Sequence, residues 1–227
     1  MIGALFDFDG TLYTGHVWQD LARHLWQHRQ NRRWVMAYVA RNMAPLPLYK
    51  LGLVDQVTYY QLWGETMVWL LRGWQEDEGR ALFVRLTEEC IMPNLRQDLL
   101  DRLRSHQEQG HLVALVSGTF APWLEIIAGR MQVEHAIGTP LELQNGRFSG
   151  RIIPPLCQGD GKTTRVRAYL EERQLDMDWA ASYAYGDSGT DIHLLREIGH
   201  PVAVYPDEIL WAQAQAVGWP VIGEVGS

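Results

Sequence analysis

The sequence predicts an α/β fold: a Rossmann-like parallel sheet with helices on both faces, plus an inserted all-helical cap domain. Short apolar runs, such as residues 2–6 and 111–116, are bounded by polar residues, which is typical of strands buried on both faces. After residue 95 such runs alternate with helical segments, whereas residues 14–91 carry helical periodicity alone. We therefore expect a core domain formed by residues 1–13 and 95–227, and a cap domain formed by residues 14–94.

The first strand, residues 2–6, leads directly into the cap segment, where we expect about four helices. Apolar residues recur there at the spacing of one helix face, beginning at Val17 and Trp18, and Thr14 is placed to cap the first helix. Pro45 interrupts the pattern once, and Pro93 closes it. Residues 13–15 and 92–95 are the expected hinges for opening and closing of the cap.

The rest of the chain returns to alternating strands and helices, with one hairpin at Asn145-Gly146. The predicted helices cover residues 95–103, with Gly110 able to end the first, then 120–130, 163–172 and 191–198. The predicted strands cover residues 111–116, 183–185 and 202–204, and the hairpin covers 141–153. Because the strands are separated by helices, they should lie parallel in one sheet.

Charge and composition exclude several classes of function. The 227 residues carry a formal net charge of −7, which argues against a nucleic-acid partner, because phosphate contacts need clustered Lys and Arg. No segment reaches the roughly 18 consecutive apolar residues of a membrane span, and the N-terminus lacks the pattern of a signal peptide. We expect a cytoplasmic protein.

Polar residues gather where the predicted strands end, at the edge of a parallel sheet where ligands bind. They are Asp7 and Asp9 after the first strand, Ser117, Gly118 and Thr119 after the second, Asp187 and Asp191 after a later strand, and Lys162 at the start of a helix. Carboxylates brought together raise one another's pKa unless a cation neutralises them. Because Mg²⁺ prefers carboxylate oxygens, water and substrate phosphate, Mg²⁺ is the expected cofactor.

The same residue types suit phosphoryl transfer. A carboxylate can attack phosphorus and divide one displacement into formation and hydrolysis of an aspartyl phosphate, while a second carboxylate manages the protons. Asp7 and Asp9 are two residues apart and so begin on the same side of the strand. Ser117 and nearby backbone amides can hold phosphate oxygens, and Lys162 supplies positive charge. Taken alone, "DFDGT" is also compatible with an ordinary capped turn.

The segments "DFDGTL", "VSG", the lysine of "GDGKTT" and "GDSGTD" resemble, in order, the four motifs of the haloacid dehalogenase-like phosphohydrolases. The helical insertion and "GHPVAVYPD" resemble the phosphoserine phosphatase-like branch, subfamily IB. The resemblance implies a phosphomonoesterase. It implies that Asp7 is the nucleophile, Asp9 the acid and base, Ser117, Gly118 and Lys162 the phosphate ligands, and Asp7, Asp187 and the backbone carbonyl of Asp9 the metal ligands. We expect Thr11, Asp191 and His16 to support this site, although His16 is not a family residue.

One departure bears on the substrate. The branch places a glutamate nine residues after the nucleophile to hold the ammonium group of phosphoserine, and this chain has His16 there. An imidazole does not favour an ammonium group, so we expect a different small or lipid-like phosphomonoester. Three other readings stay open: a phosphotransferase with the same intermediate, a non-catalytic phosphate-binding protein, and a receiver-type signalling module.

The cap segment is basic and rich in tryptophan. Residues 21–54 contain no Asp or Glu and six Lys and Arg residues, and six of the ten tryptophans lie in the insertion. One interpretation is a lid that admits an anionic, partly apolar ester and makes transient contact with a membrane surface. The other is a solvated basic face over a tryptophan-rich core. His24 and His28, four residues apart, are expected to be lid or surface residues and not a metal site.

Overall fold

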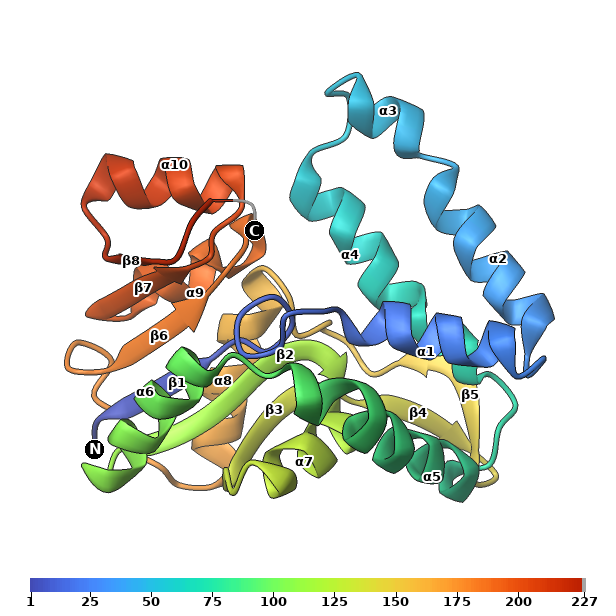
Figure 1. Cartoon of the computed structure of the whole chain (residues 1–227), viewed down its shortest axis with the longest axis horizontal. Helices are drawn as coiled ribbons and strands as arrows, with labels where there is room; N and C mark the ends of the chain where they lie inside the picture. The colour runs from blue at the N-terminus through green and yellow to red at the C-terminus, as the bar shows by residue number, and fades with distance from the viewer. Residues whose placement is uncertain (226–227) are drawn as a thin grey trace.

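The computed structural model describes residues 1–225, apart from the side chains of residues 56 and 57, and its centre is a six-stranded sheet (Figure 1). All neighbouring strands are parallel, in the order β3-β2-β1-β6-β7-β8. Their bounds are β1 Gly3–Phe6, β2 Leu112–Phe120, β3 His135–Thr139, β6 Tyr183–Gly186, β7 His200–Val204 and β8 Val221–Ile222. The predicted Rossmann-like sheet is confirmed, and β1 lies at its centre.

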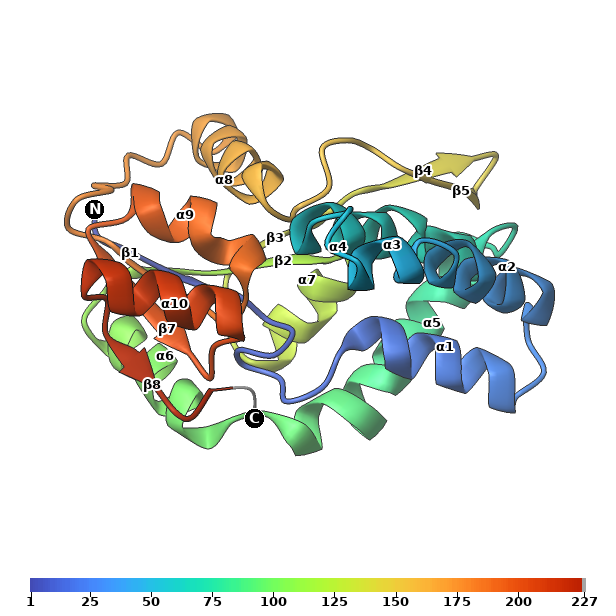
Figure 2. The same ribbon diagram turned by 90° about the horizontal axis from the view of Figure 1, so that it is seen from above.

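Helices cover both faces of this sheet because its strands are apolar on both sides. Ala4 and Phe6 of β1 pack in one hydrophobic cluster, and Leu5 packs in the other. The first face carries α6 (Gln97–Glu108) and α7 (Ala121–Arg130). The second carries α8 (Asp160–Glu172), α9 (Ile192–Glu197) and α10 (Glu208–Val217), as Figure 2 shows from above.

The insertion after β1 is helical throughout, as predicted, and it contains five α-helices in place of the expected four, because a short helix forms after Pro45. It contains α1 (Val17–Gln27), α2 (Arg32–Met43), α3 (Leu46–Lys50), α4 (Gln56–Thr66) and α5 (Glu76–Leu86), with a 3-10 turn at Met67–Leu71, a π-helical turn at Thr87–Ile91 and a 3-10 turn at Met92–Asn94. Tyr38 is fully buried against the rings of Trp18 and Trp63. Phe83 of α5 stacks on Trp123 of α7 with a centroid distance of 4.9 Å, so one hydrophobic cluster runs from the insertion into the core.

The hairpin β4 (Leu141–Gln144) and β5 (Arg147–Ile152) forms where Asn145-Gly146 predicts it, but it leaves the main sheet. The backbone of Phe148 exchanges hydrogen bonds with the insertion: its amide donates to the Trp74 carbonyl at 3.0 Å, and its carbonyl accepts from Gly73 at 2.9 Å. The hairpin therefore packs under the inserted helices, and the division into two domains by sequence segment stays a prediction.

Several elements differ from the sequence prediction. The strand predicted at 111–116 continues to Phe120, and β3, α10 and β8 were not predicted. The expected cap at Thr14 is wrong: α1 begins at Val17 after His16, and the Thr14 hydroxyl donates to the Asn94 carbonyl at 3.1 Å. In the described part of the chain, no helix is both long and apolar enough to cross a bilayer.

Candidate active site

The turn after β1 sets the position of the two leading carboxylates. The Asp7 amide extends the strand pairing by donating to the Tyr185 carbonyl at 2.9 Å. The chain then reverses at Gly10, which has φ +82°. A Cβ atom at Gly10 would lie 2.1 Å from a carboxylate oxygen of Asp187, so only glycine fits this turn. The turn therefore brings the first and last motifs together.

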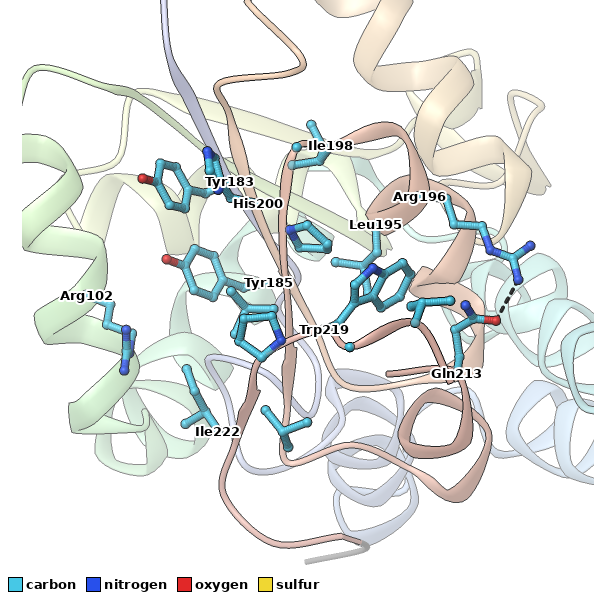
Figure 3. A pocket seen from close by; sticks show the side chains of 17 residues that line it. Arg102, Tyr183, Tyr185, Leu195, Arg196, Ile198, His200, Gln213, Trp219 and Ile222 are labelled. Atoms are coloured by element: carbon cyan, nitrogen blue, oxygen red, sulfur yellow. Dashed lines mark hydrogen bonds between the residues drawn. The ribbon is translucent and has the colours of Figure 1, made fainter. Parts of the chain in front are cut away.

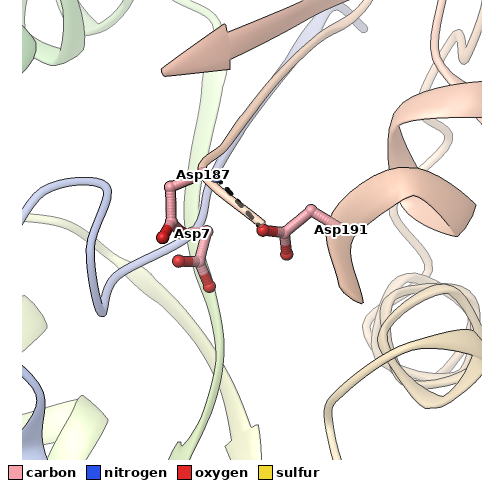
Figure 4. Close-up of side chains that lie close together, drawn as sticks. All are labelled: Asp7, Asp187 and Asp191. Atoms are coloured by element: carbon pink, nitrogen blue, oxygen red, sulfur yellow. Dashed lines mark hydrogen bonds between the residues drawn. The ribbon is translucent and has the colours of Figure 1, made fainter. Parts of the chain in front are cut away.

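Three carboxylates meet at the carboxyl ends of β1 and β6. Oxygen atoms of Asp7, Asp187 and Asp191 all lie within 4.8 Å of one another (Figure 4). Burial raises the pKa of Asp7 to about 7, with Asp191 adding to the rise, although Lys162 opposes it. Burial followed by the charges of Asp7 and Asp191 raises the pKa of Asp187 well above its ordinary value. The cluster therefore requires positive charge to hold all three groups ionised at neutral pH.

Lys162 supplies part of that charge from the first turn of α8. Its Nζ donates to Asp7 Oδ1 at 2.5 Å and also to Asp191 Oδ1, and the residue is only 2% exposed. Burial acts to lower the lysine pKa, but the two carboxylates more than offset this and raise it. Lys162 is therefore a permanent cation, one charge against three carboxylates. The remaining donor set consists of carboxylate oxygens, which fits a small hard cation such as Mg²⁺.

Asp9 lies beside this cluster, and its carboxylate is bound separately. Its Oδ1 accepts from the backbone amide of Val17 at 2.7 Å, and its Oδ2 accepts from the Thr119 hydroxyl at 2.8 Å and from the Ser117 hydroxyl at 3.4 Å. Burial raises the pKa of Asp9, and the charge of His16, followed by the hydrogen bonds from Val17 and Thr119, moderates the rise. Because Val17 is the first residue of α1, the amino end of the first inserted helix orients a core carboxylate.

The structure brings the other predicted residues to the same place. The Thr11 hydroxyl donates to Asp187 Oδ1 at 3.1 Å. Asp191 Oδ2 accepts from the amides of Asp187 and Ser188 at 3.2 and 3.1 Å, which fixes the loop after β6. Gly118 and His16 line the same cavity, and His16 is exposed at its edge.

These groups form one end of a cavity of about 430 Å³, and the inserted helices form the other. The side chains that the insertion contributes are mainly aromatic or apolar: His16, Val17, Trp18, Tyr59, Tyr60, Trp63 and Met67. The rings of Trp18 and Trp63 have centroids 4.8 Å apart, and Tyr59 meets Trp63 edge to face at 6.2 Å. The cavity therefore has a charged floor and an aromatic wall.

Several lining residues were not assigned a role from the sequence. Thr119 could have been found, because it lies two residues after Ser117 on the same strand and so faces the same side. Asp207 also lines the cavity and accepts from the Gly189 amide at 3.0 Å. Tyr59 and Tyr60 carry no sequence signal that separates them from packing residues.

A larger cavity of about 650 Å³ lies beside the amino-terminal ends of β6 and β7 and around β8 (Figure 3). It is lined by Tyr183, Tyr185, His200 and Trp219 among others, and Arg196 donates to Gln213 at its rim at 2.6 Å. None of the predicted site residues lines it. The chemistry that the motifs predict is therefore confined to the smaller cavity at the opposite ends of the strands.

Comparisons with known proteins agree with this arrangement. The family model described as haloacid dehalogenase-like hydrolase matches residues 4–196. A histidinol-phosphatase of Neisseria meningitidis is 33% identical over 154 residues, which are 67% of this chain and 69% of that protein. A probable phosphatase of Mycobacterium tuberculosis is 27% identical over 150 residues, 66% of this chain, and this chain spans about half of its length (51%).

Solved structures give the same result for the fold. A protein of unknown function from Bordetella pertussis superposes with a TM-score of 0.81 at 30% identity, over 97% of each chain. A structure described as a phospho-aspartyl intermediate analogue of phosphoserine phosphatase superposes with a TM-score of 0.63, over 98% of this chain and 94% of that one. At 17% identity the second likeness concerns the fold alone.

Proposed function

The chain belongs to the haloacid dehalogenase-like hydrolases, as its motifs predict, and we propose that it is a magnesium-dependent phosphomonoesterase that works through an aspartyl phosphate at Asp7. One observation carries the proposal: the two leading carboxylates are held apart in different environments. Asp7 is bound by Lys162 in the acidic cluster, whereas Asp9 is bound by Thr119 and an amide of the insertion. Two carboxylates in different surroundings can take the roles of nucleophile and acid.

In the first half-reaction an oxygen of Asp7 attacks phosphorus, and the bond from phosphorus to the ester oxygen breaks. Asp9, whose pKa is raised by burial, gives its proton to the departing alcohol. Ser117, the Gly118 amide and Lys162 are placed to bind the phosphoryl oxygens, since they line the same cavity. In the second half-reaction Asp9 takes a proton from water, the water oxygen attacks phosphorus, and the bond to Asp7 breaks to release phosphate.

Asp7 and Asp187 would hold Mg²⁺ with the help of Asp191, and the ion would supply Lewis-acid stabilisation of charge on the phosphoryl group. We expect Mg²⁺ to raise the melting temperature of the wild-type protein, because it relieves repulsion among buried carboxylates. Asp187→Asn should abolish most of that increase while leaving the protein folded. Equal melting temperatures of the wild-type protein with and without Mg²⁺ would contradict the metal assignment.

We also propose that the leaving group is apolar and contains a planar ring. The wall opposite the charged floor is built from Trp18, Trp63, Tyr59 and Tyr60, and His16 stands where an acidic group would be needed for an ammonium. The names of two relatives, histidinol-phosphatase and phosphoserine phosphatase, describe substrates of those proteins. Both compounds therefore belong in any substrate panel.

The test is phosphate release with Mg²⁺ from benzyl phosphate, cyclohexylmethyl phosphate, histidinol phosphate, phosphoserine and acetyl phosphate, with Asp7→Asn as the blank. Benzyl and cyclohexylmethyl phosphates have similar leaving-group basicity and size, so they isolate the contribution of the aromatic ring. We expect benzyl phosphate to be preferred over the saturated ester and over phosphoserine. Borohydride reduction during turnover should convert Asp7 to homoserine, which reports the covalent intermediate.

Each part of the proposal can fail separately. Hydrolysis of acetyl phosphate without a preference for benzyl phosphate would contradict the proposed ring-containing leaving group, while the proposed phosphatase activity would stand. No release from any compound would favour a phosphate-binding protein. Formation of a new phosphate ester when an alcohol is added would instead indicate a phosphotransferase, which shares the first half-reaction.

A further inference from the structure

The outer edge of the insertion exposes an unusual number of apolar side chains. They are Met36, Val39 and Met43 on α2, then Leu48 on α3 and Leu51 and Leu53 just after it, each at least 42% exposed. Leu51 and Leu53 reach 73% and 72%. Figure 1 shows α2 and α3 at the periphery of the insertion, away from the six-stranded sheet. We call this set of six residues the outer apolar surface.

On α2 these residues follow helical spacing. Met36, Val39 and Met43 are separated by three and four positions and so lie on one side of the helix, while Val35 and Tyr38 face the interior. Further along the chain, exposed apolar residues recur on the short helix α3 and on either side of Gly52. Gly52 has φ +71° and open space around it. Contiguous exposed apolar residues of this kind usually mark a contact with another phase or molecule.

The outer apolar surface lies in a chain segment whose charges have one sign, and the first acidic residue after that segment is the exposed Asp55 at the start of α4. From residue 21 to residue 54 the chain contains no Asp or Glu, and the exposed residues Arg29, Arg33, Arg41 and Lys50 lie in that range. The whole chain has a net charge of −7, so the positive charge here is a local feature set against an acidic remainder. A partner for this surface must accept apolar side chains and carry negative charge.

We propose that the outer apolar surface docks onto an anionic lipid bilayer. The boundary between headgroups and acyl chains receives leucine and methionine side chains, and anionic headgroups attract the surrounding arginines and lysine. A symmetric contact with a second copy would bring like charges of two identical basic surfaces together, which opposes that occupant. The contact is peripheral: the exposed residues lie on and beside two helices of twelve and five residues, neither of which can span a bilayer.

The helix α3, which carries Leu48 of the outer apolar surface, packs directly against a residue that lines the cavity. Tyr49 of α3 stacks on Tyr59 of α4 with centroids 4.6 Å apart and ring planes within 6°, and Tyr59 lines the cavity. A bilayer bound to α3 would therefore lie next to the aromatic wall. Docking itself rests only on the outer apolar surface and its charges, and it does not depend on the proposed catalytic activity.

The test is co-sedimentation of the full chain with vesicles of phosphatidylcholine alone and of phosphatidylcholine mixed with phosphatidylglycerol. We expect binding to the anionic vesicles that weakens as salt is added, because exposed charges are screened. Leu51→Glu with Leu53→Glu should reduce the partition coefficient by tenfold or more. The matched control is Ile209→Glu with Val217→Glu, which places the same two charges at exposed apolar positions of α10 and should bind as the wild type does.

Melting temperatures of both double variants, and their hydrolysis of acetyl phosphate, check that the variants are folded. Anionic-vesicle binding that is lost only in the Leu51 and Leu53 variant supports the proposal. The proposal is overturned if the wild-type protein does not sediment with anionic vesicles, or if both double variants sediment equally. It is also overturned if light scattering finds a dimer of the wild-type protein that dissociates only in the variant with Leu51→Glu and Leu53→Glu, because a second copy would then be the occupant.

Discussion

The two ends of the catalytic cavity differ in origin and in chemistry. The floor comes from the loops after the parallel strands and consists of buried carboxylates, hydroxyls and one lysine. The wall comes from α1, α4 and the turn after α4, and it consists mainly of aromatic and aliphatic side chains. The carboxylates of Asp7, Asp9 and Asp187 accept hydrogen bonds from Lys162, from hydroxyls or from the amino end of α1, whereas the wall is held by ring packing.

The floor determines reactivity, and the wall determines which substrates are preferred. The floor holds charged groups in a buried environment, where electrostatic contacts are strongest and an unpaired charge is most costly. The wall has few hydrogen-bonding groups, so its side chains can be substituted without leaving buried polar atoms unpaired. A substitution in the floor should therefore affect every substrate alike, whereas a substitution in the wall should change only the ranking of substrates.

The largest effect is expected for Asp7→Asn, which removes the attacking oxygen. Phosphate release should fall by about 10⁴-fold for every ester, since the amide that replaces the carboxylate is a far weaker nucleophile toward phosphorus. The melting temperature without Mg²⁺ should not fall, because the ionised Asp7 is disfavoured by burial and its pKa is raised to about 7. Phosphate assays and calorimetry check both points, with the exposed Asp101→Asn as the control. Turnover of even one ester at the wild-type rate would remove Asp7 from this role.

Lys162→Met should have the second largest effect, and it should lower both the stability of the protein and its rate. The variant leaves Asp7 and Asp191 buried without a cation, and breaking such a pair costs about 3–5 kcal/mol. For a chain of this length that corresponds to a fall in melting temperature of roughly 10 °C. The rate should drop by about 10²–10³-fold, as for the loss of one charged donor to the transferring group.

Lys50→Met provides the matched control for this variant, because Lys50 is the only other lysine and is exposed. We expect its melting temperature and its rate with acetyl phosphate to equal those of the wild type. If Lys162→Met were as stable as Lys50→Met, the lysine would contribute nothing to holding the carboxylates together.

Thr119→Val should lower the rate by about tenfold, the value of one hydrogen bond to a charged group. The hydroxyl of Thr119 helps to keep the pKa of Asp9 down, against the larger rise caused by burial. Its removal should move the pKa of Asp9 upward. The alkaline limb of kcat/KM, where Asp9 must still hold its proton, should therefore shift to higher pH.

Thr119→Ser keeps the hydroxyl and should restore the wild-type profile, which separates positioning of Asp9 from a general loss of packing. A Thr119→Val enzyme with a lower rate but an unmoved alkaline limb would indicate a structural role alone.

The floor could be predicted from the sequence and the wall could not, for physical reasons. Asp7, Asp9 and Asp187 follow strands of a parallel sheet, whose geometry brings the loops after its strands to one edge, and Lys162 lies at the start of a helix. Trp18 and Trp63, which line the cavity, lie in apolar stripes of the same helical period as the stripe that contains the buried Tyr38. Periodicity alone therefore cannot separate a residue that lines a cavity from one that is packed in the core. The missed β3 and β8 are short or partly polar strands that pair only because longer neighbours are already in place.

The smallest effect is expected for Trp63→Leu. Leucine keeps an apolar side chain on α4 but removes the aromatic face toward the cavity, a contact worth about 0.5–1.5 kcal/mol, or roughly a 2- to 12-fold preference. The ratio of kcat/KM for benzyl phosphate over cyclohexylmethyl phosphate should fall by that factor, while hydrolysis of acetyl phosphate stays unchanged. Trp69→Leu is the matched control, because Trp69 packs against Trp34 within the insertion and does not line the cavity. If the two variants lowered the rates of all three substrates equally, the wall would act on the chemistry as the floor does, and the division between reactivity and selectivity would be wrong.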